Sequence, residues 1–142
     1  MPAVTAAGAV VETLGNLGVT RFAFASPYVA TLNDLAIAFI EADGLSCVGR
    51  FDAPEPISNQ GVAALTPEEV MDFASRADRP EAEAIVLSCT DMRALEAVPE
   101  IEARQGKPVV TSNQALMHVG LKRLGIAATG SCLAGHRISS GA

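Results

Sequence analysis

The chain has 142 residues, a formal net charge of −6 and a hydrophobic fraction of 49%. This length suits one folded domain, and the apolar fraction argues against extended disorder. A surface for nucleic acid is excluded, because such a surface needs clustered Lys and Arg, whereas this chain has ten of them scattered along its length.

The three cysteines, at positions 47, 89 and 132, are odd in number and show no C-x-x-C or Cys/His spacing. We therefore expect neither a disulfide framework nor a structural metal. The amino terminus lacks a basic segment followed by an apolar one, and no apolar run is long enough to span a membrane. These features predict a cytoplasmic protein in reducing surroundings, with no membrane or nucleic-acid partner.

The first third of the chain predicts helix, strand, helix and strand in turn. Thr5 can cap a helix that ends near Leu17, and residues 21–25 form a short strand pattern. Apolar residues between positions 32 and 40 recur at the spacing of one buried helix face. Residues 45–51 then predict a second strand.

The middle of the chain begins with a long loop, residues 52–65, which contains two prolines, an asparagine and a glycine. A loop of this length invites a functional explanation. Thr66 is followed by Pro67 and, at the third position, Glu69, so a capped helix is predicted from there to about residue 77. Residues 84–88 predict the third strand.

The last predicted elements are a helix over 93–104, a strand over 108–111 and a final helix that ends near residue 124. Pro99 should start, kink or divide the first of these helices. Asn113 can cap the second one.

Strands that alternate with helices predict an α/β fold in three layers. We expect an approximately four-stranded parallel sheet with helices on both faces, as in Rossmann-like and flavodoxin-like proteins. Residues 1–124 would form this single domain. Residues 125–142 are small and polar, without a helical or strand period, and predict an irregular or flexible tail.

The run that ends at Cys89 is the most informative feature of the sequence. A buried strand pattern brings this cysteine to its carboxyl end, where open α/β sheets bind ligands. The predicted helix after it would favour the thiolate through its dipole, which would suit a nucleophile or a proton donor. The alternative is an inert buried cysteine, since free cysteine is among the most buried residue types.

Other polar residues lie at predicted strand ends or in the long loop. Tyr28 follows the first strand, where its phenol could serve an anionic substrate or simply shield the sheet. Asn59 could bind a carboxylate or serve a local turn. Ser88 and Thr90 could orient substrate oxygens, or Thr90 could cap the next helix.

The remaining candidates have weaker placements. Cys47 lies within a strand pattern and is most simply a small apolar residue, and nothing ties Cys132 to a site. His118 and His136 have no placement that suggests a base for Cys89. No glycine-rich dinucleotide or nucleoside-triphosphate motif occurs, so we expect no cofactor.

Two segments, 87–93 (LSCTDMR) and 106–114 (GKPVVTSNQ), resemble the C-terminal half of maleate cis-trans isomerases. These enzymes are grouped with arylmalonate decarboxylases in the aspartate/glutamate racemase superfamily. The segment 26–28 (SPY) with Asn33, and Asn59 at the position of a substrate-binding asparagine, extend the resemblance over roughly residues 5–124.

The resemblance implies one half of an Asp/Glu racemase fold and a cofactor-independent, metal-free isomerisation of maleate to fumarate. It implies catalytic roles for Cys89 and Tyr28 and a small dicarboxylate substrate. The substrate-binding residues that it implies are Asn59, Ser88, Thr90 and Ser26. Since glycines commonly follow the cysteine in decarboxylases, the threonine after Cys89 favours an isomerase.

Two alternatives stay open. A decarboxylase-like or amino-acid racemase-like enzyme would use the same cysteine on another acid. Family members are typically built from two similar α/β halves that face each other across the substrate, and only the second half is recognised here. The chain could therefore be a catalytically incomplete acid-binding module or a truncated fragment, completed by a missing N-terminal half or by a homo-oligomer.

Overall fold

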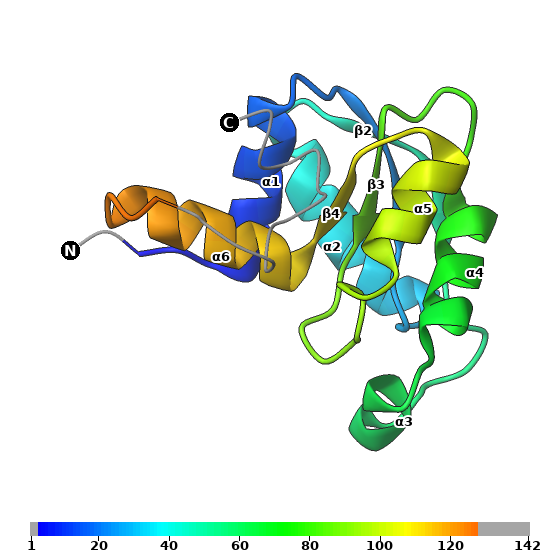
Figure 1. Cartoon of the computed structure of the whole chain (residues 1–142). Helices are drawn as coiled ribbons and strands as arrows, with labels where there is room; N and C mark the ends of the chain where they lie inside the picture. The colour runs from blue at the N-terminus through cyan, green and yellow to red at the C-terminus, as the bar shows by residue number, and fades with distance from the viewer. Residues whose placement is uncertain (1–2, 128–142) are drawn as a thin grey trace.

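The computed structural model describes residues 3–127, over which helices and strands alternate along the chain (Figure 1). The elements are α1 (Ala6–Asn16), β1 (Arg21–Ala25), α2 (Ala30–Glu41), β2 (Ser46–Phe51), α3 (Asn59–Ala63), α4 (Pro67–Ala77), β3 (Ala84–Leu87), α5 (Val98–Gln105), β4 (Val109–Thr111) and α6 (Ser112–Arg123).

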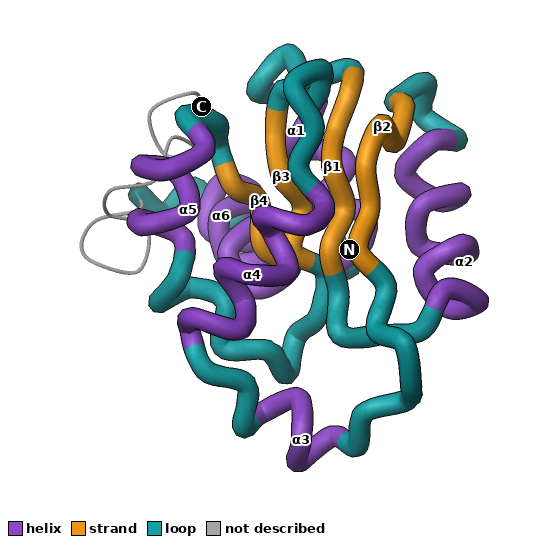
Figure 2. The backbone as a smooth tube through the Cα atoms, turned by 90° about the vertical axis from the view of Figure 1, so that its right-hand side faces the viewer, coloured by secondary structure: helices purple, strands orange, loops and turns teal. Residues whose placement is uncertain are grey.

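The four strands form one parallel sheet in the order β2-β1-β3-β4. Side chains of α4 and α5 pack on one face of the sheet, and those of α1, α2 and α6 pack on the other (Figure 2). The predicted three-layer α/β fold with helices on both faces is therefore confirmed. The three connections between successive strands are crossovers, which place the carboxyl ends of all four strands at one edge of the sheet.

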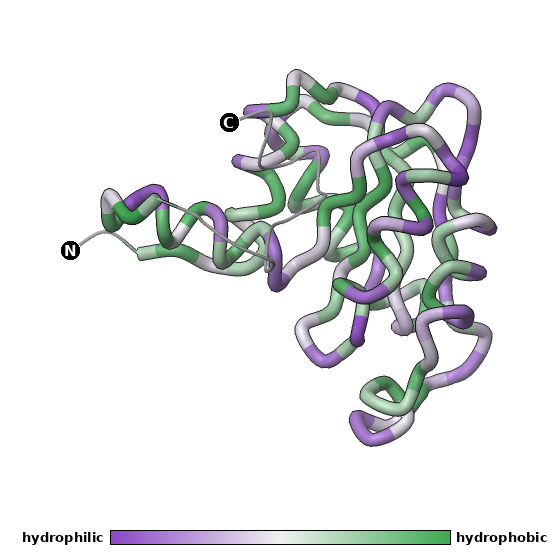
Figure 3. The backbone as a smooth tube through the Cα atoms, in the orientation of Figure 1, coloured by the Kyte–Doolittle hydropathy of each residue, from purple (hydrophilic) through white to green (hydrophobic). Residues whose placement is uncertain are grey.

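The two faces of β1 differ in the size of their side chains. Ala23 and Ala25 point towards α4 and α5, whereas Phe22 and Phe24 point towards α1 and α2, and all four are fully buried. Apolar residues accordingly concentrate in the strands at the centre of the molecule (Figure 3). The small alanines leave room for α4, which contacts β1 on this face.

The helix starts show which sequence signals were decisive. Thr5 accepts a hydrogen bond from the backbone N–H of Gly8, and Thr66 and Glu69 form the predicted capping box. The predicted cap at Asn113 is wrong, because Thr111 accepts from the N–H of Gln114 and starts α6 earlier. The last residue of β4 thus serves as the cap.

The predicted helix over 93–104 is wrong at its start. The structure has turns after β3, and α5 begins only at Val98, with Pro99 in its first turn. A helix running from residue 93 would bring the Pro99 ring against the carbonyl of Leu95 and leave that carbonyl without a helical donor. Pro99 therefore starts the helix, which is one of the three roles predicted for it.

The predicted loop 52–65 contains the short helix α3, which Ser58 caps through its hydroxyl and the N–H of Gly61. This helix lies beyond the carboxyl edge of the sheet (Figure 1). The final helix ends at Arg123. The predicted tail, 125–142, falls mostly outside the described residues, so the domain boundary at 124 stays a prediction.

Gly49 marks a close approach between β2 and the end of α4. A Cβ atom at this position would collide with the carbonyl oxygen of Ala77 and with the side chain of Arg79. The strand can therefore lie against α4 only with glycine here. Among residues 3–127, no helix combines the length and the apolar character that a membrane crossing needs.

Candidate active site

The site forms where β1 and β3 end side by side. Ala25 and Leu87 are paired in the sheet, and the N–H of Ser88 donates to the carbonyl of Ala25 at 3.0 Å. The segments that follow these two strands therefore leave the same edge together, although they are far apart in the sequence.

The pairing brings Tyr28 and Cys89 into direct contact. The Tyr28 Oη and Cys89 Sγ atoms are 3.1 Å apart, and either atom can be the donor. Cys89 is 6% exposed and packs with the apolar residues under α4 and α5. The predicted catalytic pair is thus one hydrogen-bonded unit at the end of the sheet.

The contact changes the acidity of the phenol. The hydrogen bond with Cys89, partial burial and the nearby charges of Cys89 and Asp91 raise the pKa of Tyr28 to about 12, from an ordinary 10.0. Tyr28 therefore keeps its proton at neutral pH and can donate a hydrogen bond to sulfur or to a substrate oxygen.

A buried polar network lies behind Tyr28. Ser26 is fully buried, and its hydroxyl donates to Asn33 Oδ1 at 2.5 Å and accepts from the N–H of Tyr28 at 3.0 Å. Asn33 Nδ2 donates to Asp52 Oδ1 at 2.7 Å, and Arg50 donates to the same carboxylate. The network joins the ends of β1 and β2 to the first turns of α2.

Burial and the hydrogen bonds of this network act in opposite directions on the pKa of Asp52. Desolvation favours the neutral acid, but the hydrogen bonds from Arg50 and Asn33 and the Arg50 charge outweigh it and lower the pKa of Asp52. Asp52 is therefore an ionised acceptor, and the groups facing it must be donors.

A pocket of about 240 Å³ opens beside Cys89. It is lined by residues 89–96 of the turns after β3 and by Thr111 and Asn113 at the start of α6. The Asn113 amide donates to the carbonyl of Thr90 at 2.9 Å and so holds the rim of the pocket. The volume suits a ligand of a few heavy atoms rather than a nucleotide.

The predicted substrate-binding residues fall into different environments. Ser88 is half-buried, whereas Thr90 is exposed at the pocket. Asn59 is the first residue of α3, and its exposed side chain has no hydrogen-bond partner among the described residues. Ser26 is nearest to Tyr28, but its hydroxyl is already bonded within the network.

Two expectations about the neighbourhood of Cys89 are wrong. Because α5 begins only at Val98, no helix amino terminus follows Cys89 directly, and the predicted effect of a helix dipole on its thiol lacks a structural basis. The alternative role of Thr90 as a helix cap is wrong for the same reason, since Ala97 occupies that position.

Sequence reasoning missed Asn113 and Asn33 as parts of the site. The sequence did contain a signal for each residue, because Asn113 follows the fourth strand and Asn33 lies in the helix that follows the first strand. Parallel strands bring all such segments to one edge. Without the strand order, however, nothing in the sequence shows which of these polar residues meet.

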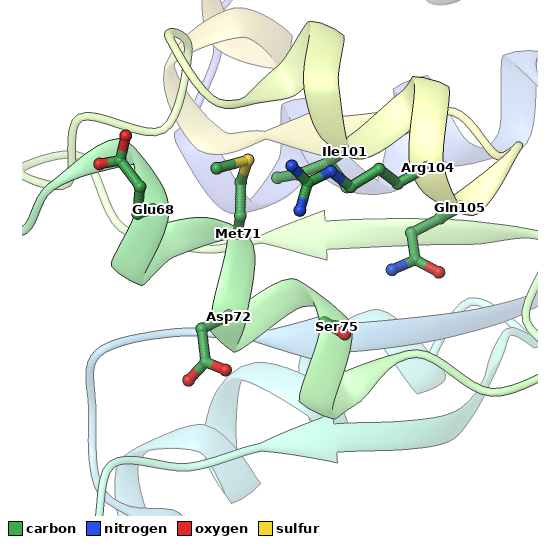
Figure 4. A pocket seen from close by; sticks show the side chains of 7 residues that line it. All are labelled: Glu68, Met71, Asp72, Ser75, Ile101, Arg104 and Gln105. Carbon is green, nitrogen blue, oxygen red and sulfur yellow. The ribbon is translucent and has the colours of Figure 1, made fainter.

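A second pocket, of about 310 Å³, lies between α4 and α5 (Figure 4). Met71 and Ile101 line it together with charged side chains from both helices. Its Arg104 is paired with Glu100 and its Asp72 with Arg76, so these charges are already compensated. With no cysteine or histidine among its lining residues, and no base shown beside Ser75, this pocket is a poor candidate for catalysis.

The other titratable candidates lie away from this edge. Cys47 is half-buried on β2, packs with the opposite face of the sheet, and donates to the carbonyl of Gly49 at 3.3 Å. His118 is buried midway along α6. Cys132 and His136 lie outside the described residues. Within residues 3–127, no group of three or more His, Cys, Asp or Glu side chains is arranged to hold a metal ion.

Comparisons with known proteins agree with this geometry. A family model described as arylmalonate decarboxylase matches residues 1–134. A maleate isomerase of Pseudomonas putida is 36% identical over 124 residues, which are 87% of this chain and 49% of that protein. The chain spans about half the length of the curated relatives it matches.

Solved structures give the same result. A variant of the maleate isomerase Iso of Pseudomonas putida S16, with one cysteine replaced by alanine and maleate bound, matches with a TM-score of 0.88. The identity is 29%, and the match covers 100% of this chain and 56% of that one. A second match is a Nocardia farcinica maleate cis-trans isomerase in which one cysteine is replaced by serine and a succinylcysteine intermediate is covalently bound. Its TM-score is 0.80 and its identity 30%, and the match covers 85% of this chain and 49% of that one.

Proposed function

Because this chain belongs to the arylmalonate decarboxylase family, we propose that it carries the Cys89 half of a maleate isomerase-type active site. The reaction is the cofactor-independent conversion of maleate to fumarate. The observation that carries the proposal is the 3.1 Å contact between the Tyr28 phenol and the Cys89 thiol at the carboxyl edge of the sheet.

The chemistry needs two sulfur atoms on opposite sides of the substrate. A first thiolate adds to one alkene carbon, and the electron pair of the double bond moves to the other carbon, next to a carboxylate. Transfer of the Cys89 proton to that carbon gives a saturated succinyl thioether, whose central bond can rotate. Return of the proton to Cys89 and loss of the first thiolate then yield fumarate.

The succinylcysteine in the Nocardia farcinica structure supports this sequence of steps, because it is the saturated adduct that addition and protonation give. In this chain the neutral Tyr28 phenol would hold Cys89 Sγ in place during both proton transfers. Its hydrogen bond would also stabilise negative charge that develops on the sulfur.

Of the predicted substrate-binding residues, Thr90 lines the pocket beside Cys89, and Ser88 and Asn59 lie outside its lining. We propose that Ser88, Thr90 and Asn59 contact the carboxylates, together with backbone N–H groups after β3. Asn59 would reach the substrate only if α3 lies against the bound acid. The buried hydroxyl of Ser26 would act through the turn that carries Tyr28 rather than on the substrate itself.

The first thiol has to come from outside the described residues. Cys47 is on the opposite face of the sheet, which leaves Cys89 as the one cysteine of residues 3–127 at this edge. We propose that a companion α/β half supplies the other thiol, in agreement with the half-length match to the relatives.

A surface on α6 suits that companion. Leu116, Met117, Leu121 and Leu124 line a shallow apolar groove of about 420 Å³, which ends at Asn113 on the rim of the Cys89 pocket. A half seated there would border the site directly and cover apolar area that is now exposed. A solution mass of two chains that falls to one in Leu124→Glu would instead assign the groove to a second copy of this chain.

We also propose a cytoplasmic location. Reducing surroundings keep a thiol such as Cys89 free for proton transfer, and Cys47 and Cys89 are unpaired in the structure. Fractionation of cells that express the chain tests this, and recovery with a membrane or extracellular fraction would contradict it.

A second candidate is favoured by the half-length match itself. A chain that holds one thiol of two would bind a small dicarboxylate without isomerising it. The description of the family model leaves a further reaction open, the decarboxylation of an arylmalonate. Both candidates use the same pocket and can be separated from isomerisation by assay.

The decisive experiment follows the vinyl signals of maleate and fumarate by proton NMR, with titration calorimetry on maleate and a parallel arylmalonate assay. In the presence of the companion half, we expect turnover to fall by about 10²-fold or more in Cys89→Ser, the usual size of a lost proton-transfer group. Cys47→Ser is the matched control and should keep it.

Binding of maleate without turnover would support the acid-binding half. Decarboxylation alone would support the decarboxylase. A chain that neither binds nor converts any of these acids, or a Cys89→Ser variant with full turnover, would overturn the proposal.

A further inference from the structure

We propose that Asn33 is a positioning residue for the Tyr28–Cys89 pair. Its buried amide ties the turn after β1 to the loop after β2 and so fixes the phenol against the thiol. This inference deepens the proposed function, and it depends on that function only for its effect on turnover.

The Asn33 side chain is fully engaged. It is 1% exposed, and its Oδ1 atom accepts the hydroxyl of Ser26 at 2.5 Å. Its Nδ2 atom donates to the carbonyl of Tyr28 at 3.1 Å and to Asp52 Oδ1 at 2.7 Å. A buried amide that satisfies both of its ends in this way is rigid, because any rotation leaves a polar group without a partner.

The charge of Asp52 sets the orientation of this amide. Arg50 donates to the Asp52 carboxylate from Nε and Nη2, at distances between 2.8 and 3.2 Å, and to Asp34 from Nη1 at 2.8 Å. An ionised carboxylate only accepts, so Asn33 must present its Nδ2 atom to Asp52 and its oxygen to Ser26. A flipped amide would place its oxygen against the Asp52 carboxylate and the Tyr28 carbonyl, both of which can only accept.

The network holds the backbone of Tyr28 at both of its polar groups. The N–H donates to Ser26 Oγ at 3.0 Å, and the carbonyl accepts from Asn33 and from the N–H of Ala53 at 2.9 Å. With the backbone fixed, only the two side-chain torsions of Tyr28 remain to place its hydroxyl. Asn33 therefore acts on the Cys89 contact through Tyr28, without touching sulfur itself.

The test uses the phenol as its own reporter. The chain has one tyrosine and no tryptophan, so the ultraviolet absorbance of tyrosinate reports Tyr28 alone. In Asn33→Asp the new carboxylate faces Asp52 and has no N–H for the Tyr28 carbonyl. We expect the pKa of Tyr28 to fall from about 12 towards 10.0 as the phenol leaves Cys89.

Two further variants separate positioning from general damage to the fold. Asn33→Asp combined with Asp52→Asn restores a donor and acceptor between the two positions but still leaves the Tyr28 carbonyl without its Asn33 partner. Its Tyr28 pKa should therefore remain below that of the unmodified chain even where its melting temperature recovers. Glu100→Gln, which removes one exposed carboxylate on α5 away from this network, should leave the titration unchanged.

The outcomes are distinct. A folded Asn33→Asp chain, or a folded double variant, whose Tyr28 still titrates at about 12 would overturn the inference. If the unmodified chain converts maleate, the Asn33 variants should lower kcat more than KM. If the Tyr28 pKa falls in the variants but the unmodified chain neither binds nor converts maleate, the positioning role stands and the proposed function fails.

Discussion

The two described cysteines occupy the two faces of one sheet and differ in what surrounds them. Cys47 lies within β2, packs with residues under α1 and α2, and gives its S–H to the carbonyl of Gly49. Cys89 lies just beyond β3, packs on the other face, and contacts the Tyr28 phenol.

Burial alone does not show which thiol is reactive. Cys47 is the less buried of the two, yet its surroundings are those of a structural residue. Desolvation is the main cause that raises the pKa of the Cys47 thiol, and its neighbours are backbone and edge charges. Cys89 instead faces a proton-bearing side chain and a pocket of small-molecule size. Position at a strand end therefore tells more about the role of a thiol than exposure does.

The largest effect that would test this contrast is on the titration of Tyr28. Because the hydrogen bond with Cys89 is the main cause of the raised pKa, Cys89→Ala should bring it from about 12 towards 10.0. A fall of this size raises the acid ionisation constant of Tyr28 by up to about a hundredfold. The ultraviolet absorbance of tyrosinate measures it, and Cys47→Ala should leave it in place. Equal shifts in the two variants would remove the distinction between the thiols.

A smaller effect should come from the surroundings of Cys47. Gly49→Ala puts a methyl group against the carbonyl of Ala77, and overpacking of this kind lowers the free energy of unfolding by about 1–3 kcal/mol. Urea denaturation measures the loss. The Tyr28 titration should stay unchanged, because the substitution disturbs β2 and α4 and not the Tyr28–Cys89 contact. A Gly49→Ala chain of undiminished stability would show that the two elements can separate at no cost.

A weaker effect is expected on the pH dependence of the free energy of unfolding, because Tyr28 is partly exposed and solvent reduces its contribution. A group whose pKa is raised by folding stabilises the folded chain below its unfolded pKa and loses that contribution as the pH rises. Stability should therefore decline between pH 10 and pH 12 through Tyr28. Tyr28→Phe should remove the part of this decline that Tyr28 causes. Denaturation at several pH values between 10 and 12 measures the free energy of unfolding of both chains. The same slope in both chains would contradict the assignment.

The smallest effect is expected from Cys47→Ser. A serine hydroxyl can still donate to the carbonyl of Gly49, so the free energy of unfolding should change by about 1 kcal/mol or less. Thermal denaturation and the maleate assay together check this. A loss of turnover in this variant comparable with that of Cys89→Ser would mean that Cys47 also serves the reaction.

Much of the fold follows from local signals in the sequence. The capping box at Thr66 and Glu69, the strand patterns and their alternation with helices suffice to predict a parallel α/β sheet. The exception is the segment after Cys89, where an apolar period near a proline suggested a longer helix than the backbone permits. Pro99 outweighs that period because its cost is steric and local.

The site was predictable as a place but not as a network. Tyr28 and Cys89 both follow strands, so the sequence predicts that they lie at the carboxyl edge of the sheet. Their contact, however, depends on β1 and β3 being neighbours. Asn33 could not be recognised as a central member, because its partners Ser26 and Asp52 come from the ends of two strands. Hydrogen-bond partners across elements are set by strand order, which no local pattern encodes.

The Tyr28–Cys89 contact joins residues separated by 61 positions, and it exists only after β1 and β3 have paired. Closing a loop of that size costs entropy before any contact repays it, so the contact should form late in folding. Until then the thiol lacks its phenol partner and the pocket beside it does not exist. A chain emerging during synthesis therefore has both reactive residues before it has a site, and the pairing of two strands decides when the chemistry becomes available.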